Sequence, residues 1–292
     1  MTVEPDRERL RGSLAAADGW GAGTVALAVV DSSGTVAGHG APDTALPWAS
    51  VTKLLTGYVA LIAIQRGIVA LDDPAGPPGA TLRHLLAHAA GYSADGQAFL
   101  QRPAVTRIYS NTGIDVAAAF VATRAGRPFG ALLREWVLDP LGMTGTRLVD
   151  APSRGLVGPA RDLAAFAREL IRPRLIQPSA LAAATTVAFP GLRGVLPGVG
   201  RFDPCDWGLA FELRDGKVPH WTGARNSPRT FGHFGRSGTF LWVDPEAGIA
   251  LAGLTDREYG PWALEAWPAL SDAVLDAYQP KLPGSPLTGP TT

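Results

Sequence analysis

Hydrophobic runs near the two ends of the chain have the lengths and turn signals of strands and flanking helices. A short amphipathic helix is predicted over 4–17, and a strand over 24–30 is joined by the turn 31–34 to a second arm at 35–40. Near the C-terminus the pattern predicts strands over 207–213, over 231–235 with its continuation 238–243, and over 249–255, then a closing helix over 261–278. These elements predict an antiparallel sheet built from both ends of the chain and flanked by terminal helices.

The middle of the chain has mostly helical patterning. Its most apolar helix begins after Pro47 and is expected to reach about Arg66, where Gly67 ends it. Shorter helices are predicted over 82–88, 114–124, 129–137, 160–171 and 178–185.

The resulting fold class is α+β, with a mainly helical lobe inserted into the sheet. We expect residues 1–46 and 195–278 to form the α/β lobe and residues 47–194 the helical lobe. The segment 279–292 is rich in Pro, Gly, Ser and Thr and is expected to be disordered. A pocket is expected at the seam between the lobes, where the helix after Pro47 begins.

Composition narrows the function classes. The 292 residues can bury a large core, and the formal net charge of zero gives no sign of a nucleic-acid surface. The single cysteine, Cys205, excludes an internal disulfide. No apolar leader is seen at the start, and the longest apolar runs fall short of the ~20 residues of a membrane helix. We expect a cytoplasmic protein without nucleic-acid or membrane partners, and the sequence leaves the oligomeric state open.

Ser50 and Lys53 are candidates for a nucleophile and its base. Positions i and i+3 lie on one helical face, so the two side chains can share a proton, which a serine nucleophile needs. The lysine must be neutral, so burial or nearby positive charge must lower its pKa from about 10.4. Spacing alone also fits a helix cap followed by a solvated lysine. However, the chain has three lysines against 23 arginines, and arginine cannot act as a base.

Two further motifs follow in order, Tyr-Ser-Asn at 109–111 and His-Phe-Gly at 233–235. The first is informative because the chain contains only two asparagines, whereas the second is weak among 35 glycines. Together with Ser-x-x-Lys they resemble the signature of active-site serine penicillin-recognising enzymes. The tyrosine form is similar to class C β-lactamases, D,D-carboxypeptidases, D-aminopeptidases and related esterases.

The resemblance to the β-lactamase-related serine hydrolase family covers roughly residues 20 to 278 and implies a β-lactamase/transpeptidase-like fold. It is carried by family-like segments at 48–53, 67–74, 82–91, 140–143, 160–164, 232–239 and 242–245.

The resemblance implies roles for five residues. Ser50 would be the nucleophile that forms an acyl-enzyme, and Lys53 would assist its deprotonation. Tyr109 would be the second base and proton shuttle, with its pKa lowered by the charge of Lys53. Asn111 would hold Lys53 and the substrate carbonyl. His233 would stand where the family has a lysine and would tune Tyr109.

The same resemblance implies that Gly235 lets the substrate lie along its strand, and that the backbone N–H groups of Ser50 and Arg236 form the oxyanion hole. Phe234 departs from the family pattern, which has a carboxylate-binding hydroxyl there, so β-lactamase activity is less expected. Arg236 either replaces that contact or points to solvent. Trp48, Tyr92, Trp221 and Phe234 are candidates for an apolar acyl pocket, although each also suits the core.

His84 and His88 have the i, i+4 spacing of metal ligands, but no H-E-x-x-H glutamate or third ligand accompanies them. We therefore predict packing or capping histidines, and no metal or cofactor.

These observations favour a serine hydrolase of a small-molecule ester, amide or short peptide. The alternatives are a β-lactamase or D,D-carboxypeptidase, a catalytically inactive binding module on the same fold, and an acyltransferase. The chain has neither a G-x-S-x-G elbow nor a P-loop, which argues against α/β-hydrolases and nucleotide sites.

Overall fold

The computed structural model describes residues 6–278, so the segment 279–292, which we predicted to be disordered, lies outside the described residues. A six-stranded antiparallel sheet has the order β2-β1-β11-β10-β9-β8. The N-terminal hairpin of β1 and β2 joins the C-terminal strands because β1 pairs with β11. The strands are β1 (Val25–Asp31), β2 (Gly34–Gly40), β8 (Glu212–Leu213), β9 (Phe231–Gly235), β10 (Thr239–Asp244) and β11 (Ile249–Thr255).

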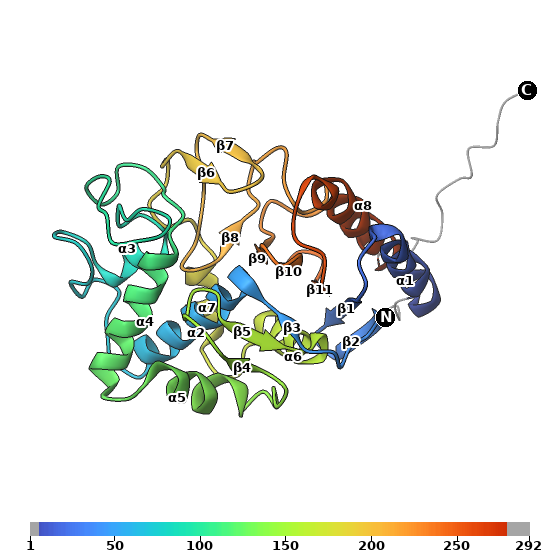
Figure 1. The fold of residues 1–292 in the computed structure, drawn as a ribbon, viewed down its shortest axis with the longest axis horizontal. Helices are drawn as coiled ribbons and strands as arrows, with labels where there is room; N and C mark the ends of the chain where they lie inside the picture. Colours follow the sequence, from blue (N-terminus) through green and yellow to red (C-terminus); the bar gives the residue numbers. More distant parts are fainter. Residues whose placement is uncertain (1–5, 279–292) are drawn as a thin grey trace, which may run out of the picture.

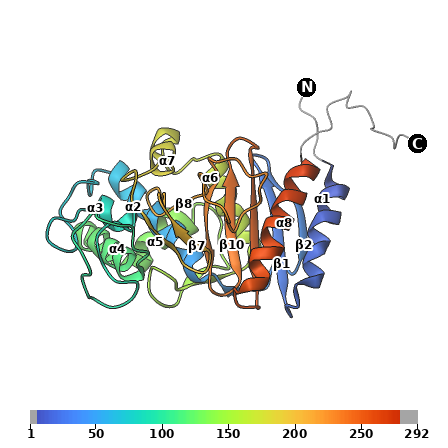
Figure 2. The same ribbon diagram turned by 90° about the horizontal axis from the view of Figure 1, so that it is seen from above.

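Helices cover both faces of this sheet. Figures 1 and 2 show α1 (Arg7–Leu14) and α8 (Pro261–Tyr278) on one face and α6 (Ala160–Ile171) on the other. Successive side chains of a strand point to opposite faces, so Leu27 of β1 joins the core beneath α1 and α8, whereas Ala28 joins the core on the α6 side. The fold class predicted from the sequence, an α+β β-lactamase/transpeptidase-like architecture, is confirmed.

Apart from η1 (Ala15–Trp20), which follows α1 and packs against α8, the remaining helices gather beside the sheet, at the left of Figure 1. At their centre is α2 (Thr52–Gln65), which is buried continuously from Thr52 to Ala63 and packs on α4 and α5. A helix that is apolar on all sides is stable only inside a core, which explains its composition. The others are η2 (Ala49–Val51), α3 (Leu82–Leu86), α4 (Asn111–Ala125), α5 (Phe129–Leu133), the π-helical turn η3 (Arg134–Leu138) and α7 (Pro178–Ala184).

Two small sheets were not predicted. Their strands are two or three residues long, too short to produce a hydrophobic period. They are β3 (Leu46–Pro47), β4 (Arg147–Leu148) and β5 (Leu156–Gly158) in one sheet, and β6 (Gly194–Leu196) and β7 (Gly200–Phe202) in the other.

The strand predicted over 207–213 is wrong over most of its length, because only Glu212–Leu213 is a strand. The segment turns back on itself: Gly208 N donates to Phe211 O, and Ala210 has φ 66°. Every residue from 207 to 213 is buried, so the alternation of large and small side chains in the sequence does not mark a strand with one exposed face.

Two helix boundaries also differ from prediction. Helix α4 begins at Asn111, earlier than the predicted 114, because the Ser110 hydroxyl accepts a hydrogen bond from Gly113 N and caps the first turn. Helix α3 ends at Leu86, before the predicted 88, because His88 has φ 54°, outside the helical region.

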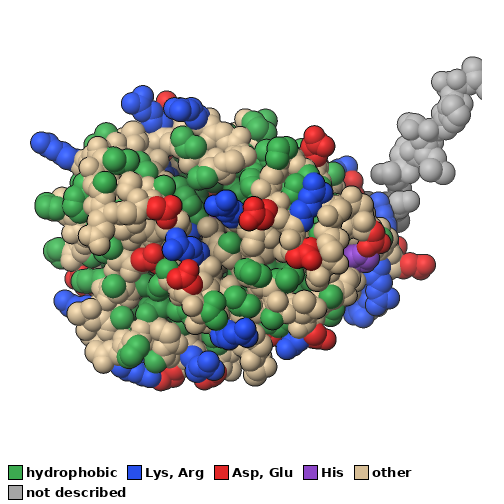
Figure 3. Space-filling view, in the orientation of Figure 1, with side chains coloured by type: hydrophobic (Ala, Val, Ile, Leu, Met, Phe, Trp, Pro, Cys, Tyr) green, Lys and Arg blue, Asp and Glu red, His purple; other side chains and the backbone are tan. Residues whose placement is uncertain are grey.

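Helix α6 packs on the sheet through β1, β10 and β11, although it lies within the range predicted as the helical lobe. The lobe boundaries at 46/47 and 194/195 stay a prediction. Basic and acidic side chains are mixed over the face in Figure 3, in keeping with the net charge of zero. None of the helices among residues 6–278 has the length and apolar character of a membrane-spanning segment.

Candidate active site

Ser50 lies in the single turn η2, where the chain passes from β3 into α2. The preceding Ala49 has φ 45°, a conformation that costs a non-glycine residue about 1–2 kcal/mol. This turn is fixed through Trp48, whose carbonyl accepts a hydrogen bond from Thr239 Oγ1 (2.9 Å) and whose Nε1 donates to Gly158 O (2.9 Å). The strained turn is thereby fixed to the main sheet and to β5, with the Ser50 side chain half-buried.

Lys53 Nζ lies within hydrogen-bond distance of Ser50 Oγ (3.1 Å), Asn111 Oδ1 (2.6 Å) and Ser153 O (2.8 Å). As an ammonium it donates to all three oxygens, whereas as a neutral amine it donates to Asn111 and Ser153 and has a lone pair that accepts from the Ser50 hydroxyl. The side chain is fully buried. Burial lowers the pKa of Lys53 to about 7, against the opposing effect of the Asp115 carboxylate. The amine is therefore neutral in a large fraction of molecules at pH 7, as a general base beside Ser50 must be.

Tyr109 Oη donates a hydrogen bond to Ser50 Oγ (2.7 Å), and Lys53 Nζ lies 4.8 Å from the centroid of the Tyr109 ring. We expected the charge of Lys53 to lower the pKa of Tyr109. The structure gives the opposite direction: desolvation raises the pKa of Tyr109 above its ordinary value, and the hydrogen bond to Ser50 only partly offsets this. Tyr109 is therefore a neutral phenol in the resting site.

Asn111 connects Lys53 to an acidic side chain. Its Oδ1 accepts from Lys53 Nζ, and its Nδ2 donates to Asp95 Oδ1 (2.9 Å). This pairing fixes the orientation of the amide, because the oxygen must face the amine and the nitrogen the carboxylate.

His233 lies on β9, with its ring centroid 5.7 Å from that of Tyr109. Its Nδ1 donates to the Phe234 carbonyl (2.6 Å), and burial lowers its pKa to about 3. The imidazole is therefore neutral at pH 7. Where the resemblance implied a tuning group in the place of a lysine, the structure has an uncharged ring packed beside Tyr109.

The two backbone N–H groups implied for the oxyanion hole are those of Ser50 and Arg236. Neither donates a hydrogen bond to another of the residues 6–278, so both are available to a ligand. The Arg236 side chain is exposed and forms no ion pair with the described part of the chain.

Gly235 brings β9 against the nucleophile turn. A Cβ at Gly235 would lie 2.6 Å from Trp48 O and 2.6 Å from Thr239 Oγ1, closer than real Cβ contacts allow. The glycine is therefore required for the close contact of β9 with Trp48, in the turn that carries Ser50. This role differs from the one implied by the resemblance, which was to leave room for the substrate.

Phe234 points away from the site and packs in the core beneath α8, with its ring centroid 4.8 Å from that of Tyr259 and 5.4 Å from that of Trp221. The suggested apolar acyl pocket is not formed by the four aromatic residues named for it. They are all buried core side chains: Trp48, Tyr92, Trp221 and Phe234.

Sequence reasoning missed the groups that hold Lys53 from behind. Ser153 accepts from Lys53 through its backbone carbonyl, and its own N–H and hydroxyl donate to Asp115 (2.8 and 3.0 Å). Every residue has a backbone carbonyl, so no sequence pattern could indicate that the Ser153 carbonyl accepts from Lys53. Asp115 lies four residues after Asn111 on α4, and this i, i+4 spacing was an available signal.

Arg107 was also missed. Its buried guanidinium donates to four backbone carbonyls, those of Ala87, Cys205 (2.7 Å), Ala188 (2.7 Å) and Phe189 (3.1 Å). These bonds tie the segment that precedes Tyr109 to three other parts of the chain.

The two histidines with metal-ligand spacing have separate tasks. His84 Nδ1 accepts from Thr81 N (3.2 Å) in a capping box and its ring stacks on Phe189, which confirms the capping prediction for this residue. The buried His88 accepts from Ser110 N (3.1 Å) and packs against Tyr109. Within residues 6–278 no cluster of three or more His, Cys, Asp or Glu side chains is arranged to hold a metal ion.

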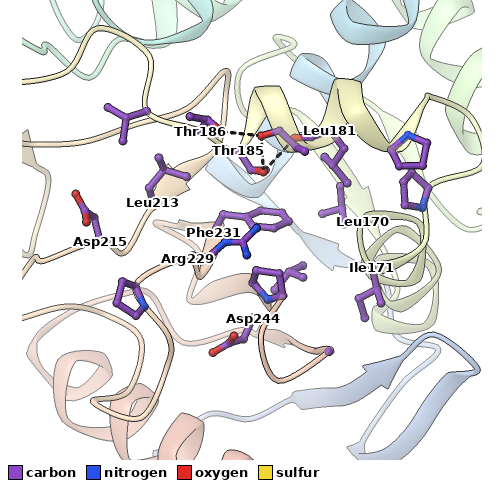
Figure 4. A pocket seen from close by; sticks show the side chains of 18 residues that line it. Leu170, Ile171, Leu181, Thr185, Thr186, Leu213, Asp215, Arg229, Phe231 and Asp244 are labelled. Carbon is purple, nitrogen blue, oxygen red and sulfur yellow. Dashed lines mark hydrogen bonds between the residues drawn. The ribbon is translucent and has the colours of Figure 1, made fainter.

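A cavity of about 750 Å³ opens beside Tyr109, between the segment 106–109 and the hairpin of β6 and β7. A separate cavity of about 580 Å³ lies between α6, α7 and the far ends of β8, β9 and β10 (Figure 4). It contains none of the predicted site residues, and Phe231, which lines it, is at the opposite end of β9 from Gly235. Of the predicted catalytic residues, Tyr109 lines the first cavity, which therefore adjoins the site through the phenol that contacts Ser50.

The fold, with Lys53 and Tyr109 in contact with the Ser50 hydroxyl, is that of the β-lactamase/transpeptidase-like class of serine hydrolases. A family model described as Beta-lactamase matches residues 14–275, and the chain therefore belongs to the Beta-lactamase family, whose members are serine hydrolases.

Known relatives agree with this assignment. A crystal structure of a β-lactamase from Mycobacterium bovis is 50% identical, with a TM-score of 0.90 over 91% of this chain and 99% of that one. A putative β-lactamase from Bacteroides dorei shares the fold at 17% identity, with a TM-score of 0.79 over 94% of this chain and 100% of that one. The D-alanyl-D-alanine-carboxypeptidase/endopeptidase AmpH of Escherichia coli (strain K12) is 28% identical over 149 residues, a match that spans 38% of this chain and 39% of AmpH.

Proposed function

We propose that the chain hydrolyses an ester or amide through an acyl-enzyme on Ser50. The observation that carries this proposal is the position of Ser50 Oγ, which lies 3.1 Å from Lys53 Nζ and 2.7 Å from Tyr109 Oη. A weak nucleophile between a neutral amine and a neutral phenol has a base and an acid within hydrogen-bond reach.

Acylation follows from these protonation states. Lys53 takes the Ser50 hydroxyl proton as Ser50 Oγ forms a bond to the substrate carbonyl carbon. The tetrahedral oxyanion is held by the N–H groups of Ser50 and Arg236, and each such donor contributes about 2.7–4 kcal/mol in a comparable hole. The bond to the leaving group breaks as Tyr109 gives that group its phenolic proton.

Deacylation reverses these proton transfers. The acylated site holds a protonated Lys53 and a Tyr109 phenolate, and the phenolate takes a proton from water as that water attacks the acyl carbon. Collapse of the second tetrahedral intermediate returns the Lys53 proton to Ser50 Oγ. Both side chains are then back in their starting states, so the cycle needs no other acid or base.

A second candidate, a β-lactamase or D,D-carboxypeptidase, is favoured by the 50% identical Mycobacterium bovis protein and by the match to AmpH. Against it, Phe234 stands where the family signature places a hydroxyl, and its side chain is buried in the core. We therefore place esters and small amides ahead of β-lactams.

The test is intact-mass analysis after incubation with a fluorophosphonate, on wild type, Ser50→Ala and a control, Ser179→Ala, which removes an exposed serine of α7. We expect a single adduct on wild type and control, none on Ser50→Ala, and turnover of p-nitrophenyl esters. Rapid hydrolysis of nitrocefin would favour the second candidate. Absence of an adduct on folded wild-type protein would contradict the proposal and favour a non-catalytic binding module.

The pH dependence should report Lys53. Because the base must be neutral, kcat/KM for an uncharged ester is expected to rise as pH increases through about 7, the pKa of Lys53, and then to level off. Initial rates between about pH 5.5 and 9 measure this profile, with circular dichroism at each pH as the control for folding. A kcat/KM that decreases through the same range would contradict the assignment of Lys53 as the base.

A further inference from the structure

Two arginines line the cavity beside Tyr109 without a charged partner. Arg193 and Arg201 are both exposed, and neither forms an ion pair with the described part of the chain. The arginines of this protein that do form ion pairs include Arg161, with Asp43, and Arg225, with Asp276. What sets Arg193 and Arg201 apart from other exposed arginines is their place at the wall of a cavity, where a guanidinium can donate two parallel hydrogen bonds to a carboxylate or phosphate.

The hairpin of β6 and β7 positions these two side chains. Arg201 lies on β7, Arg193 is the residue before β6, and both side chains line the same cavity. Val195 stands opposite Arg201 in the register. Continuing that register sets Arg193 opposite Asp203, the one acid of the lining, with which it forms no ion pair in the described part of the chain.

The charge balance of the cavity is positive. Its lining contains Arg107, Arg193 and Arg201 against a single acid, Asp203. Arg107 is occupied by backbone carbonyls, which leaves the other two guanidinium groups to meet a ligand. Apolar side chains complete the wall: Ile108, Val195, Pro197 and Phe202. A ligand that fits has an apolar body and an anionic end.

The hairpin is held in a fixed place relative to Tyr109. Arg107 N donates to Arg193 O (2.9 Å), and Gly194 packs so closely on Arg107 that a Cβ there would lie 2.6 Å from Arg107 O. On the other side of the hairpin, Tyr259 Oη donates to Gly198 O (3.1 Å). Tyr109 follows Arg107 by two residues, so the segment that carries the catalytic phenol is hydrogen-bonded directly to the hairpin that carries Arg193 and Arg201.

We propose that Arg193 and Arg201 bind the carboxylate of an anionic ester or amide substrate whose carbonyl is attacked by Ser50. The inference rests on the proposed function and names its substrate class. The arginine fork suits a carboxylate because it can donate two parallel hydrogen bonds. The carboxylate can belong to the acyl part of the substrate or to its leaving group. Substrates with a carboxylate in one part or the other distinguish these two arrangements.

The kinetic test uses matched pairs. For the acyl side, mono-p-nitrophenyl adipate is compared with its terminal amide; for the leaving-group side, 4-carboxyphenyl acetate is compared with 4-carbamoylphenyl acetate. We expect the anionic member of one pair to have a kcat/KM about 10- to 100-fold higher. In Arg193→Gln/Arg201→Gln this ratio should fall to near one, and high salt should reduce it in wild type.

Arg134→Gln, which removes an exposed arginine of η3, is the control and should keep the wild-type ratio. Equal kcat/KM values within both pairs, or a preference that survives in the double variant, would overturn the inference.

A binding measurement separates this inference from the hydrolase proposal. Isothermal titration of adipate monoamide into Ser50→Ala, with and without the two arginine substitutions, needs no catalysis. We expect affinity to fall about tenfold or more when both arginines are replaced. Unchanged affinity, or no binding to either protein, would overturn the anion site even if esters are hydrolysed. Binding that depends on the arginines, without ester turnover, would support the site while contradicting the proposed chemistry.

Discussion

Replacing Lys53 with methionine is expected to lower kcat/KM for esters by about 10²- to 10⁴-fold, the range that a general base contributes. Methionine fills a similar volume in the buried space of Lys53 but cannot accept the Ser50 proton. The measurement is the initial rate with a p-nitrophenyl ester, together with thermal unfolding to show that the variant folds.

Lys53→Arg is the matched variant for this prediction. Arginine keeps a positive charge and hydrogen-bond donors near Ser50 but stays protonated at every accessible pH. If Lys53 acts as a base, both variants should lose activity. An arginine variant with near wild-type rates would show that only the charge is needed, which would contradict the proton transfer from Ser50 to Lys53.

Replacing Tyr109 with phenylalanine is expected to lower kcat/KM by about 10²- to 10⁴-fold for alkyl esters, and by less for p-nitrophenyl esters. The difference arises because an alkoxide needs a proton to leave, whereas p-nitrophenolate leaves without one. The measurement compares kcat/KM for the two ester classes in wild type and variant.

Tyr92→Phe serves as the control for Tyr109→Phe, because Tyr92 is a buried tyrosine that packs on Phe99 and makes no contact with Ser50. It should keep near wild-type rates on both ester classes. An equal loss for alkyl and p-nitrophenyl esters in Tyr109→Phe would contradict its role as the leaving-group acid, and would indicate that the phenol acts only by orienting Ser50.

Much of the sheet followed from the sequence because its strands are continuous apolar runs beside strong turn signals, as in β10 and β11 around the turn at 244–248. The pattern failed at 207–213, where large and small residues alternate in the sequence but every residue is buried and the backbone forms a tight turn. Alternation of residue type therefore does not by itself specify an extended strand.

The centre of the site was predictable because its chemistry is carried by side chains. Ser50 and Lys53 were found from their spacing and from the scarcity of lysine. The backbone oxygen of Ser153 and the direction of the Tyr109 pKa shift were not predictable, since both depend on how distant segments surround the site. The family resemblance placed Phe234 at a substrate-binding position, with a core position as the alternative, and the twofold alternation of β9 turns its side chain into the core.

The pairing of the first strand with the last has a consequence for how the chain folds. In the register of the sheet Val25 stands opposite Thr255, so β1 has no inner partner until the chain has been synthesised through β11, more than 200 residues later. Contacts this distant in sequence require large loops to close and are associated with slow folding. Until β11 arrives, the apolar β1–β2 hairpin has an open edge that another nascent chain can occupy. The same pairing that closes the sheet thus makes incomplete chains prone to aggregate.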